Sequence, residues 1–587
     1  MHDLNGTSSG SGNSDIKWWQ DSVLYQVYPA TFKDSNGDGL GDLQGILSKI
    51  PYLASLGIDA IWISPHYKSP QKDLGYDISD YRAVHEPYGS VEDVDAIIAE
   101  AKKHGIKILC DLVVNHSSNE HAWFRESRSS RDNPKRDWYI WRDPKIVDGE
   151  RQPPNNWRCA FGGPAWTYDE KTEQYYFHAF LSEQPDLNWE LKEVRDAIYT
   201  DAVRFWLDRG VAGFRVDTVN MYSKDTSFPD APIVDPLVKE QPGWDFITNG
   251  PHMHEWLKEM RKEALGDAVT IGELPNTPRV EDVLKYIARP SRELDTVIQF
   301  DIAMLANSGW KFMKTPWKLS KFKQLTKNGQ TLADPSNEAW AINHLENHDI
   351  SRCISRFGND APEYRVQSAK MLATYMLTLS GTPIIYQGQE IGMINMPKSF
   401  DIDKEYKDCD TIGWLREVRA AMEKPDHDPT LLERAIEGIQ LSSRDHARTP
   451  IQWDSSKNGG FSTADEDACW MRPHSFKEIN AADQDKDDSS VLNYYRRLIK
   501  FRKEHKDVFV HGAFEYEPEH EADDNVFVYT KTSAKDGRKA VVVLNFSKDD
   551  QAYSLPKGSE SLKAAVFDTG NAGADGTVAP YSAKIYM

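Results

Sequence analysis

Short apolar runs alternate with amphipathic stretches along most of the chain. Eight of the runs are bounded by turn residues and are rich in β-branched and aromatic side chains, which is typical of buried strands. They cover residues 23–32, 60–65, 106–116, 213–218, 269–274, 296–301, 339–349 and 381–387. Between them, apolar residues recur three and four positions apart, which predicts helices over 91–104, 194–208 and 364–379.

This alternation of strands and helices predicts βαβ units and a parallel sheet. Eight repeats are the number that closes a (β/α)8 TIM barrel, so the expected fold class is α/β. An open, doubly wound sheet is the structural alternative. No GxGxxG sequence follows any of the eight runs, however, and this favours the barrel.

Two stretches fall outside a plain barrel. Residues 117–189 separate the third run from its helix, and an unstructured loop of that length is uncommon in a compact domain, so we expect a small inserted domain over the barrel mouth. Beyond residue 510 helical periodicity gives way to strand-like runs, which predicts a C-terminal antiparallel β domain. The expected organisation is a disordered, Gly/Ser-rich tail at 1–17, the barrel at 18–116 and 190–510, the inserted domain at 117–189 and a β-sandwich at 511–587.

Composition and charge narrow the class of protein. The 587 residues carry 70 basic and 91 acidic side chains, a net charge of −21, and 39% of them are hydrophobic, which excludes global disorder. Without a basic stripe, a nucleic-acid partner or an anionic membrane surface is not expected. Five widely spaced cysteines form no CxxC pair, and no run of about 18 apolar residues suggests a membrane anchor or a signal peptide. We therefore expect a cytoplasmic location.

Polar side chains gather where the predicted strands end. In a TIM barrel the carboxyl ends of the strands meet at one mouth, where reactive groups are placed. The candidates at these ends are Asp111, Asn115, His116, Arg215, Asp217, Glu273, Glu346, Asn347, His348 and Asp349. Several carboxylates beside an arginine suit glycoside hydrolysis, which needs one ionised and one protonated carboxyl. Metal-assisted hydrolysis is the competing interpretation, but the first run lacks the HxH pair typical of binuclear barrel sites.

These motifs, taken in order, resemble a known family. The sequences at 111–116, 213–217, 272–273 and 347–349 resemble the four motifs of the α-amylase superfamily. The stretches Gln184-Pro185-Asp186-Leu187-Asn188, Gly388-Gln389-Glu390 and 443–450 are similar to its oligo-1,6-glucosidase and α-glucosidase branch, especially the yeast and fungal maltase–isomaltase group. The resemblance runs from about residue 18 to the C-terminus.

The resemblance implies a role for each matching residue. Asp217 would be the nucleophile, Glu273 the general acid/base, and Asp349 would bind sugar hydroxyls and assist the transition state. Residues that would bind the substrate are Asp73, Tyr76, His116, Phe161, Phe180, Arg215, Thr218, His348 and Arg444. Among them, Tyr76 would stack under the sugar ring, and Asp73 with Arg444 would grip the 4-hydroxyl, closing the pocket behind one glucose. Such an enzyme would be exo-acting and retaining, with the two catalytic carboxyls ~5–5.5 Å apart.

The preferred linkage depends on the residue that follows the nucleophile. In the fungal branch this residue is Val in α-1,6-active isomaltases and Thr in maltases, and here it is Thr218. We therefore expect an α-1,4-active maltase-type α-glucosidase acting on maltose, short malto-oligosaccharides and sucrose. A sucrose isomerase or transglucosylase, or an isomaltase, is the alternative on the same scaffold. A non-catalytic relative, like the heavy subunits of amino-acid transporters, would need an anchor and could lose the carboxylates.

One loop near the N-terminus has the pattern of a cation site. Oxygen-bearing side chains stand at every second position of 34–42, as in an EF-hand, although Gly45 occupies the position of the usual Glu. Similar loops in the family bind one structural Ca²⁺ through Asp34, Asn36, Asp38, the Leu40 carbonyl and Asp42. A metal-free polar turn is the alternative. No cofactor is expected for catalysis, and the expected partner is a small saccharide, with the protein a monomer or a weak dimer.

Overall fold

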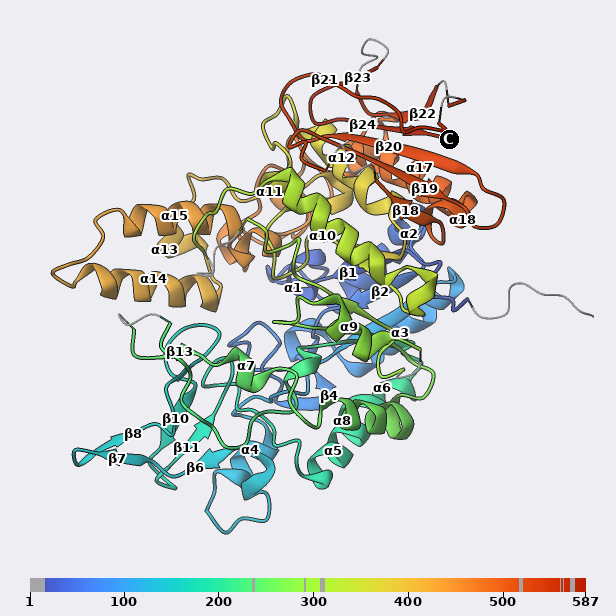
Figure 1. Cartoon of the computed structure of the whole chain (residues 1–587). Coiled ribbons are helices and arrows are strands. Elements are labelled where there is room, and N and C mark those ends of the chain that lie inside the picture. Colours follow the sequence, from blue (N-terminus) through green and yellow to red (C-terminus); the bar gives the residue numbers. More distant parts are fainter. Residues whose placement is uncertain are drawn as a thin grey trace, which may run out of the picture.

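The computed structural model describes residues 16–234, 238–289, 292–306, 312–516, 521–559, 561–562, 564–570 and 576–587. The predicted tail covers residues 1–17, and residues 1–15 of it lie outside the described residues. In Figure 1 a central barrel lies between an inserted domain, drawn below it, and a C-terminal sheet, drawn above it.

Eight parallel strands form the barrel. They are β1 (Leu24–Val27), β2 (Ala60–Ile63), β5 (Lys107–Leu112), β12 (Gly213–Val216), β14 (Val269–Glu273), β15 (Thr296–Ile298), β16 (Ile342–Asn343) and β17 (Thr382–Tyr386). Their order is β15-β14-β12-β5-β2-β1-β17-β16, and a parallel bridge between Val297 and Ala341 brings the two edges together. Each predicted run contains one of these strands, so the (β/α)8 barrel is confirmed.

Helices cover the outside of the barrel (Figure 1). The longer ones are α2 (Leu43–Leu56), α3 (Val91–Lys103), α5 (Lys192–Ile198), α8 (Met253–Met260), α9 (Val280–Ile287), α10 (Leu319–Leu332), α12 (Arg365–Thr378) and α17 (Val491–Glu504). Local sequence explains their ends: Ser90 and Asp93 form a capping box at the start of α3, and Gly57 ends α2 with a left-handed φ of 93°. The predicted helix at 194–208 is α5, a π-helical turn and the short α6 (Phe205–Leu207).

Shorter elements fill the connections. The helices among them are α1 (Pro29–Phe32), α4 (Ala122–Ser127), α7 (Trp244–Ile247), α11 (Cys353–Phe357), α13 (Ile402–Glu405), α16 (Ala481–Asp485) and α18 (Lys506–Phe509). A small hairpin of β3 (Tyr67–Lys68) and β4 (Asp80–Val84) follows β2.

The inserted domain is built around a three-stranded sheet. Its strands are β6 (Trp141–Arg142), β10 (Trp166–Asp169) and β11 (Gln174–Phe177), and a hairpin of β7 (Lys145–Val147) and β8 (Glu150–Gln152) projects from it. The domain also recruits a segment that the sequence analysis had assigned to the barrel. Beyond β12, β13 (Gln241–Pro242) pairs with β9 (Trp157–Arg158), and Phe228 and Ile247 join the apolar cluster of the insert. The segment after β12 that contains Phe228, β13 and Ile247 therefore belongs to the inserted domain and not to the barrel.

The C-terminal domain is the predicted antiparallel β domain. Its main sheet contains β18 (Ala513–Glu515), β19 (Val526–Thr532), β20 (Lys539–Asn545), β24 (Ala583–Tyr586) and β22 (Ala565–Asp568), in that order, and β21 (Gln551–Ala552) pairs with β23 (Thr577–Val578). Alternation in β19 divides the sheet into two faces. Phe527 and Tyr529 join the core cluster of the barrel, whereas Val526 and Val528 face a separate cluster that includes Val578 of β23.

A helical hairpin was not anticipated from the sequence. Helices α14 (Cys409–Met422) and α15 (Leu431–Ser442) pack against each other and project at the left of Figure 1, above the inserted domain. The hairpin leaves the barrel after β17 and returns to it through the segment at 443–450. Its first helix contacts both the inserted domain and the mouth of the barrel, which matters for the site described below.

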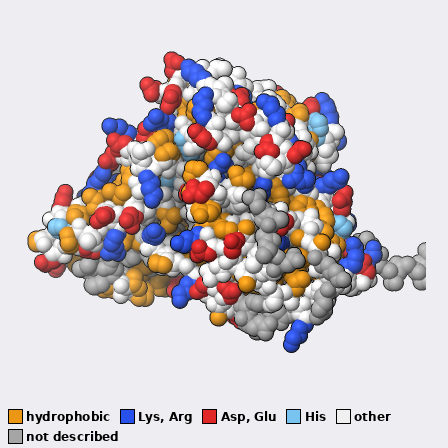
Figure 2. Space-filling view, turned by 90° about the horizontal axis from the view of Figure 1, so that it is seen from above, with side chains coloured by type: hydrophobic (Ala, Val, Ile, Leu, Met, Phe, Trp, Pro, Cys, Tyr) orange, Lys and Arg blue, Asp and Glu red, His pale blue; other side chains and the backbone are white. Residues whose placement is uncertain are grey.

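The surface agrees with the charge pattern of the sequence. On the face in Figure 2, described acidic and basic side chains are interspersed, without a broad basic patch. No helix within the described ranges is long and apolar enough to cross a membrane. All five cysteines are free thiols.

Candidate active site

Alternation along the barrel strands brings the candidate carboxylates into the interior. In β5, Ile108 and Cys110 belong to the outer core cluster, whereas Leu109 belongs to the inner one, so Asp111 also points inward. In β14, Val269 and Ile271 are inner residues, which places Glu273 on the inner side at the carboxyl end.

The same parity applies to β12. Phe214 and Val216 pack outward, so Arg215 and Asp217 point inward. The register sets Arg215 beside Asp111 on the neighbouring strand and beside Ile271 on the other side. The polar side chains of three adjacent strands therefore converge at the mouth.

Arg215 links three carboxylates there. Its Nη1 donates to Asp217 Oδ1 and to Asp111 Oδ1, each over 2.8 Å, and its Nη2 lies 2.6 Å from Glu273 Oε1. The guanidinium side chain is only 1% exposed, so these contacts act where water screens charge poorly. One cation thus holds the predicted nucleophile and the predicted acid side by side.

Thr218 contacts the same two carboxyl groups through their other oxygens. Its hydroxyl donates to Asp217 Oδ2 over 3.2 Å, and its backbone N–H donates to Glu273 Oε2, also over 3.2 Å. Each oxygen of the two predicted catalytic carboxyls therefore has one donor. Thr218 adopts a left-handed φ of 38°, which is unfavourable for a β-branched residue and is a form of strain found at functional sites.

Burial shifts the protonation of this pair. Desolvation raises the pKa of Asp217 to about 7, although the Arg215 guanidinium opposes the shift. Desolvation likewise raises the pKa of Glu273 to about 7, again against Arg215, while the neighbouring Asp217 adds to the rise. Burial thus moves both pKa values toward neutral pH, the range in which a general acid or base works best.

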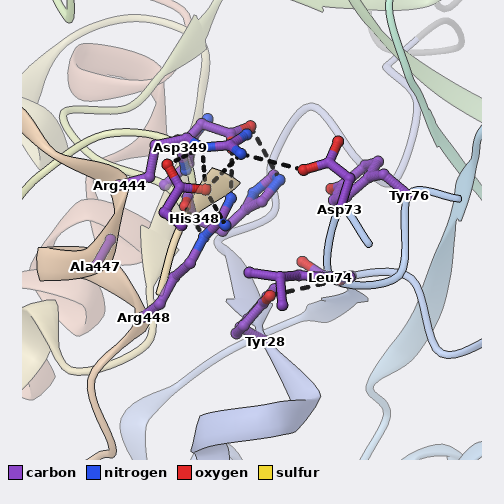
Figure 3. A network of polar contacts seen from close by, with 12 residues as sticks. Tyr28, Asp73, Leu74, Tyr76, His348, Asp349, Arg444, Ala447 and Arg448 are labelled. Atoms are coloured by element: carbon purple, nitrogen blue, oxygen red, sulfur yellow. Dashed lines mark hydrogen bonds and ion pairs between the residues drawn. The ribbon is translucent and has the colours of Figure 1, made fainter. Parts of the chain in front are cut away.

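Asp349 is held in the opposite state. Burial disfavours its charge, but His348 and two arginines hold the pKa of Asp349 well below its usual range. His348 Nε2 lies 3.0 Å from Oδ2, while Arg444 Nη1 and Arg448 Nη2 donate to Oδ1 over 3.0 and 2.9 Å. Figure 3 shows Asp349 between these partners. Asp349 is thus a fixed anion that accepts hydrogen bonds.

The closed end of the pocket is formed by an ion pair. Arg444 Nη2 donates to Asp73 Oδ1 over 3.1 Å, and both side chains are nearly buried (Figure 3). Tyr76 stacks on the His348 ring with centroids 5.1 Å apart and planes 4° from parallel. His116 contacts the Tyr76 carbonyl over 3.0 Å and packs its ring against Phe180.

These residues surround one cavity of about 410 Å³. Ten of the twelve predicted catalytic and sugar-binding residues line it: Asp73, Tyr76, His116, Phe161, Phe180, Asp217, Thr218, Glu273, Asp349 and Arg444. The other two, Arg215 and His348, are buried directly behind them. The remaining wall is mostly apolar and includes Met221, Trp244, Phe300 and Met304. The cavity thus combines charged and polar groups that can bind hydroxyls with a largely apolar remainder of the wall, as ligand pockets commonly do.

Sequence reasoning missed several buried partners. Asp408 accepts from Arg444 Nη2 over 2.6 Å and from Arg448 Nη1 over 3.0 Å, so it anchors both arginines that hold Asp349. Gln184 Nε2 donates to Asp73 Oδ2 over 3.0 Å. Asp408 directly precedes α14 and so has the sequence context of an ordinary helix cap. Only the presence of two arginines four residues apart, at 444 and 448, could have indicated a missing acidic partner.

The predicted calcium loop lies away from the cavity. Asp34 accepts hydrogen bonds from the backbone of Asn36, Gly37 and Gly39, while Asp42 caps α2 by accepting from Gly45 over 2.6 Å. Asn36 and Asp38 contact each other over 3.1 Å. Within the described part of the chain, no group of three or more His, Cys, Asp or Glu side chains is arranged to hold a metal ion. The calcium ion therefore stays a prediction.

Comparison with known proteins decides the family. Residues 26–512 match the family described as Alpha amylase, catalytic domain. The chain belongs to the α-amylase family. This confirms the resemblance found in the sequence, and with it the class of glycoside hydrolases.

Relatives in the α-amylase family match nearly the whole chain. The α-glucosidase of Candida albicans is 45% identical over 98% of this chain and 100% of its own length, and the oligo-1,6-glucosidase IMA2 of Saccharomyces cerevisiae is 42% identical over 99% of each. Among solved structures, the trehalulose synthase MutB of Pseudomonas mesoacidophila matches with a TM-score of 0.88 and 39% identity, covering 98% of this chain and 100% of that one. The isomaltulose synthase SmuA of Protaminobacter rubrum matches with a TM-score of 0.88 and 40% identity, covering 98% and 99%.

Proposed function

We propose that the protein is an exo-acting, retaining α-glucosidase of the maltase type. The observation that carries the proposal is the bracing of Asp217 and Glu273 by Arg215 and Thr218, in a pocket that Asp73 and Arg444 close at one end. Since both carboxyls contact the two amino groups of one guanidinium, they are near neighbours. Short separation is typical of retaining rather than inverting enzymes.

The reaction follows from these positions. Asp217 would attack the anomeric carbon and form a glucosyl ester, while the bond to the departing oxygen breaks and Glu273 gives that oxygen its proton. Glu273 would then take a proton from water, whose oxygen attacks the same carbon and releases Asp217. Asp349, fixed as an anion, would bind sugar hydroxyls and favour the positive charge that develops on the ring.

The linkage preference is proposed from Thr218. Thr218 lines the same cavity as the two carboxyl groups, and in the proposed complex it would lie beside the leaving sugar. A hydroxyl at this point offers the aglycone a polar contact that valine would lack. We infer a preference for α-1,4 bonds, with glucose released from maltose, short malto-oligosaccharides and sucrose.

A second candidate is a sucrose isomerase or transglucosylase. Its support is the close structural match to trehalulose and isomaltulose synthases at TM-scores of 0.88. These enzymes would share the glucosyl ester and differ in which acceptor resolves it. The curated relatives at 42–45% identity are named as glucosidases, and they favour hydrolysis.

The testing experiment is product analysis on maltose, isomaltose and sucrose in parallel, with Asp217→Ala as the inactive control. Glucose from maltose and little from isomaltose is the expected result. Fast cleavage of isomaltose would overturn the linkage preference alone, and isomaltulose or trehalulose from sucrose would favour the isomerase. No turnover on any of the three would overturn the proposal of a hydrolase and favour the non-catalytic relative, similar to the heavy subunits of amino-acid transporters.

We also propose one structural Ca²⁺ in the loop at 34–42. The support is chemical: Asp34, Asn36, Asp38, the Leu40 carbonyl and Asp42 each offer at least one oxygen, the ligand atom that a hard cation prefers. The ion would stabilise the first βα loop and take no part in the reaction. Metal analysis should find one calcium per chain, and chelation should lower Tm while added Ca²⁺ restores it. Absence of calcium with an unchanged Tm would favour the metal-free turn.

A cytoplasmic, monomeric enzyme is the proposed context. The free state of all five cysteines fits a reducing compartment. Fractionation of the source cells and light scattering of the purified protein would test the two parts separately. A secreted or a tightly dimeric protein would contradict them.

A further inference from the structure

Two parts of the molecule, the inserted domain and the helical hairpin, contact each other and form the pocket wall that contains Phe161. Phe161 belongs to the inserted domain, and the facing surface is α14 of the helical hairpin. Arg158 Nη2 lies 2.5 Å from Glu417 Oε2, and the Gly163 backbone N–H donates to Glu417 Oε1 over 3.1 Å. One carboxylate of α14 thus holds both ends of the turn that carries Phe161.

Two glycines allow this close approach. Gly162 has a left-handed φ of 95°, and a methyl group on it would overlap Glu417 Oε1. On the other side, a methyl group on Gly413 of α14 would lie 2.5 Å from the Phe161 carbonyl oxygen, closer than atoms of this kind can approach. The turn and the helix therefore meet without space between them, directly behind the Phe161 backbone.

Phe161 in turn faces the glucose end of the pocket. The Arg444 guanidinium carbon lies 5.0 Å from the centre of the Phe161 ring, and Phe180 packs against the ring at 5.9 Å. Behind this wall is a second cavity of about 460 Å³, which shares Ala160, Phe161 and Trp244 with the first. Space is thus available into which Phe161 could move if the turn were released.

We propose that Glu417 is a positioning residue for substrate binding, acting through Phe161. This inference rests on the proposed function, because Phe161 is taken to contact the terminal glucose. Glu417 does not line the pocket and so cannot touch the sugar itself. It fixes the turn against α14 and so keeps Phe161, which lines both cavities, over Arg444. Its loss should weaken substrate binding more than it slows the chemical step.

The first test compares Glu417→Ala with Glu417→Gln. The alanine variant removes both contacts, and KM for maltose should rise about fivefold with kcat nearly unchanged, the size expected for a partly buried ion pair. The glutamine variant keeps an acceptor for Gly163 and should lie in between. Arg419→Ala is the matched control, because Arg419 pairs with Asp403 on the exposed side of the same helix, over 2.8 Å. Its KM should stay at the wild-type value.

The second test perturbs the pocket wall at Phe161 by a substitution that changes no charged residue. Gly413→Ala puts a better helix former into α14, so helix stability should not fall. The added methyl would instead push against Phe161, and KM should rise as in Glu417→Ala. A combined Glu417→Ala/Phe161→Ala variant should have the KM of Phe161→Ala alone, because residues that act through one another are not additive.

The outcomes separate the two levels of the proposal. If wild-type protein hydrolyses none of the glucosides, the proposed function fails. If wild type is active and Glu417→Ala leaves KM unchanged, or if its effect adds fully to that of Phe161→Ala, the role of Glu417 is overturned. A fall in kcat and Tm without a change in KM would mark Glu417 as a stabilising contact only, which also overturns it.

Discussion

Thr218 donates its hydroxyl to Oδ2 of Asp217 over 3.2 Å from a backbone held at a φ of 38°. The other oxygen of Asp217 accepts from Arg215, so the carboxylate of the proposed nucleophile cannot rotate without breaking one of two bonds. Under the proposed function, Thr218 would therefore position the nucleophile in addition to facing the leaving sugar. Tertiary contacts, above all the bond from its backbone to Glu273, keep it there.

Removal of this hydroxyl should alter the acidic limb of the pH profile. A hydrogen bond to the ionised form lowers a carboxyl pKa, so in Thr218→Val the pKa governing the acidic limb of kcat/KM should rise by about one unit. The ratio of isomaltose to maltose cleavage should rise in the same variant. Thr218→Ser keeps the hydroxyl and serves as the control. An unchanged limb in the valine variant would show that the bond does not tune the nucleophile.

Activity should have a bell-shaped dependence on pH with its maximum near neutrality. Hydrolysis needs Asp217 ionised and Glu273 protonated, and burial raises the pKa of each to about 7. Protonation of Asp217 removes activity as the pH falls, and ionisation of Glu273 removes it as the pH rises. Measured kcat/KM on maltose from about pH 4 to 10 checks both limbs.

The basic limb can be assigned with Glu273→Gln. A substrate with a good aryl leaving group needs little acid assistance, so its first turnover should survive in this variant. The burst of aryl alcohol should keep the acidic limb and lose the basic one. Persistence of the basic limb would assign it to another group.

Asp408 should matter for catalysis although it lies outside the cavity lining. Asp408→Asn keeps the shape of the side chain but removes the charge that anchors Arg444 and Arg448. Because a hydrogen bond to a charged group contributes about 1.5–3 kcal/mol, kcat/KM for maltose should fall at least about tenfold. Asp403→Asn is the control, because Asp403 lies at an exposed position in the nearby helix α13. Full activity with a normal Tm would contradict an anchoring role.

Lys531 should make stability depend on alkaline pH. This side chain is buried against the barrel, where Nζ donates to the Gly512 carbonyl over 2.6 Å and contacts the Ser380 hydroxyl. Burial holds the pKa of Lys531 well below its usual 10.5, so the unfolded chain binds more protons between the two values. Stability contributed by this site should therefore rise with pH up to about 10.5.

Thermal unfolding from about pH 7 to 10 tests that sign. Lys531→Met removes the titrating group and should flatten the rise of Tm with pH, whatever its effect on Tm at a single pH. Lys535→Met, on an exposed turn of the same domain, controls for loss of a surface charge. An equally steep slope in the Lys531 variant would refute the assignment.

Much of the fold could be predicted because the spacing of apolar residues along the chain differs between strands and helices. Strands of the barrel are short apolar runs, and the residues that end them, such as Asp217 and Glu273, follow from the rule that parallel strands meet at one mouth. The family motifs added Asp73, Tyr76 and Arg444, which lie far from any catalytic residue in sequence. The structure brings all of these side chains together.

The parts that escaped prediction depend on contacts between distant segments. Asp408 has the local signature of a helix cap, and nothing near it in sequence reveals the two arginines that it holds. The pairing of β13 with β9 joins two strands of two residues each, too short for any periodic pattern. The helical hairpin was overlooked because its helices follow the last strand, where the barrel repeat no longer guides the assignment.

The barrel closes by pairing its first strand with its last, Leu24 against Ile384, and the pocket is completed only by Asp408 and Arg444. A chain leaving the ribosome therefore has no glucose pocket until about three quarters of it has been made. Strand β1 must wait, with one edge unpaired, for β17 to emerge. Shortened products that end before residue 444 should thus be inert toward sugars, and their open strand edges make them candidates for chaperone capture.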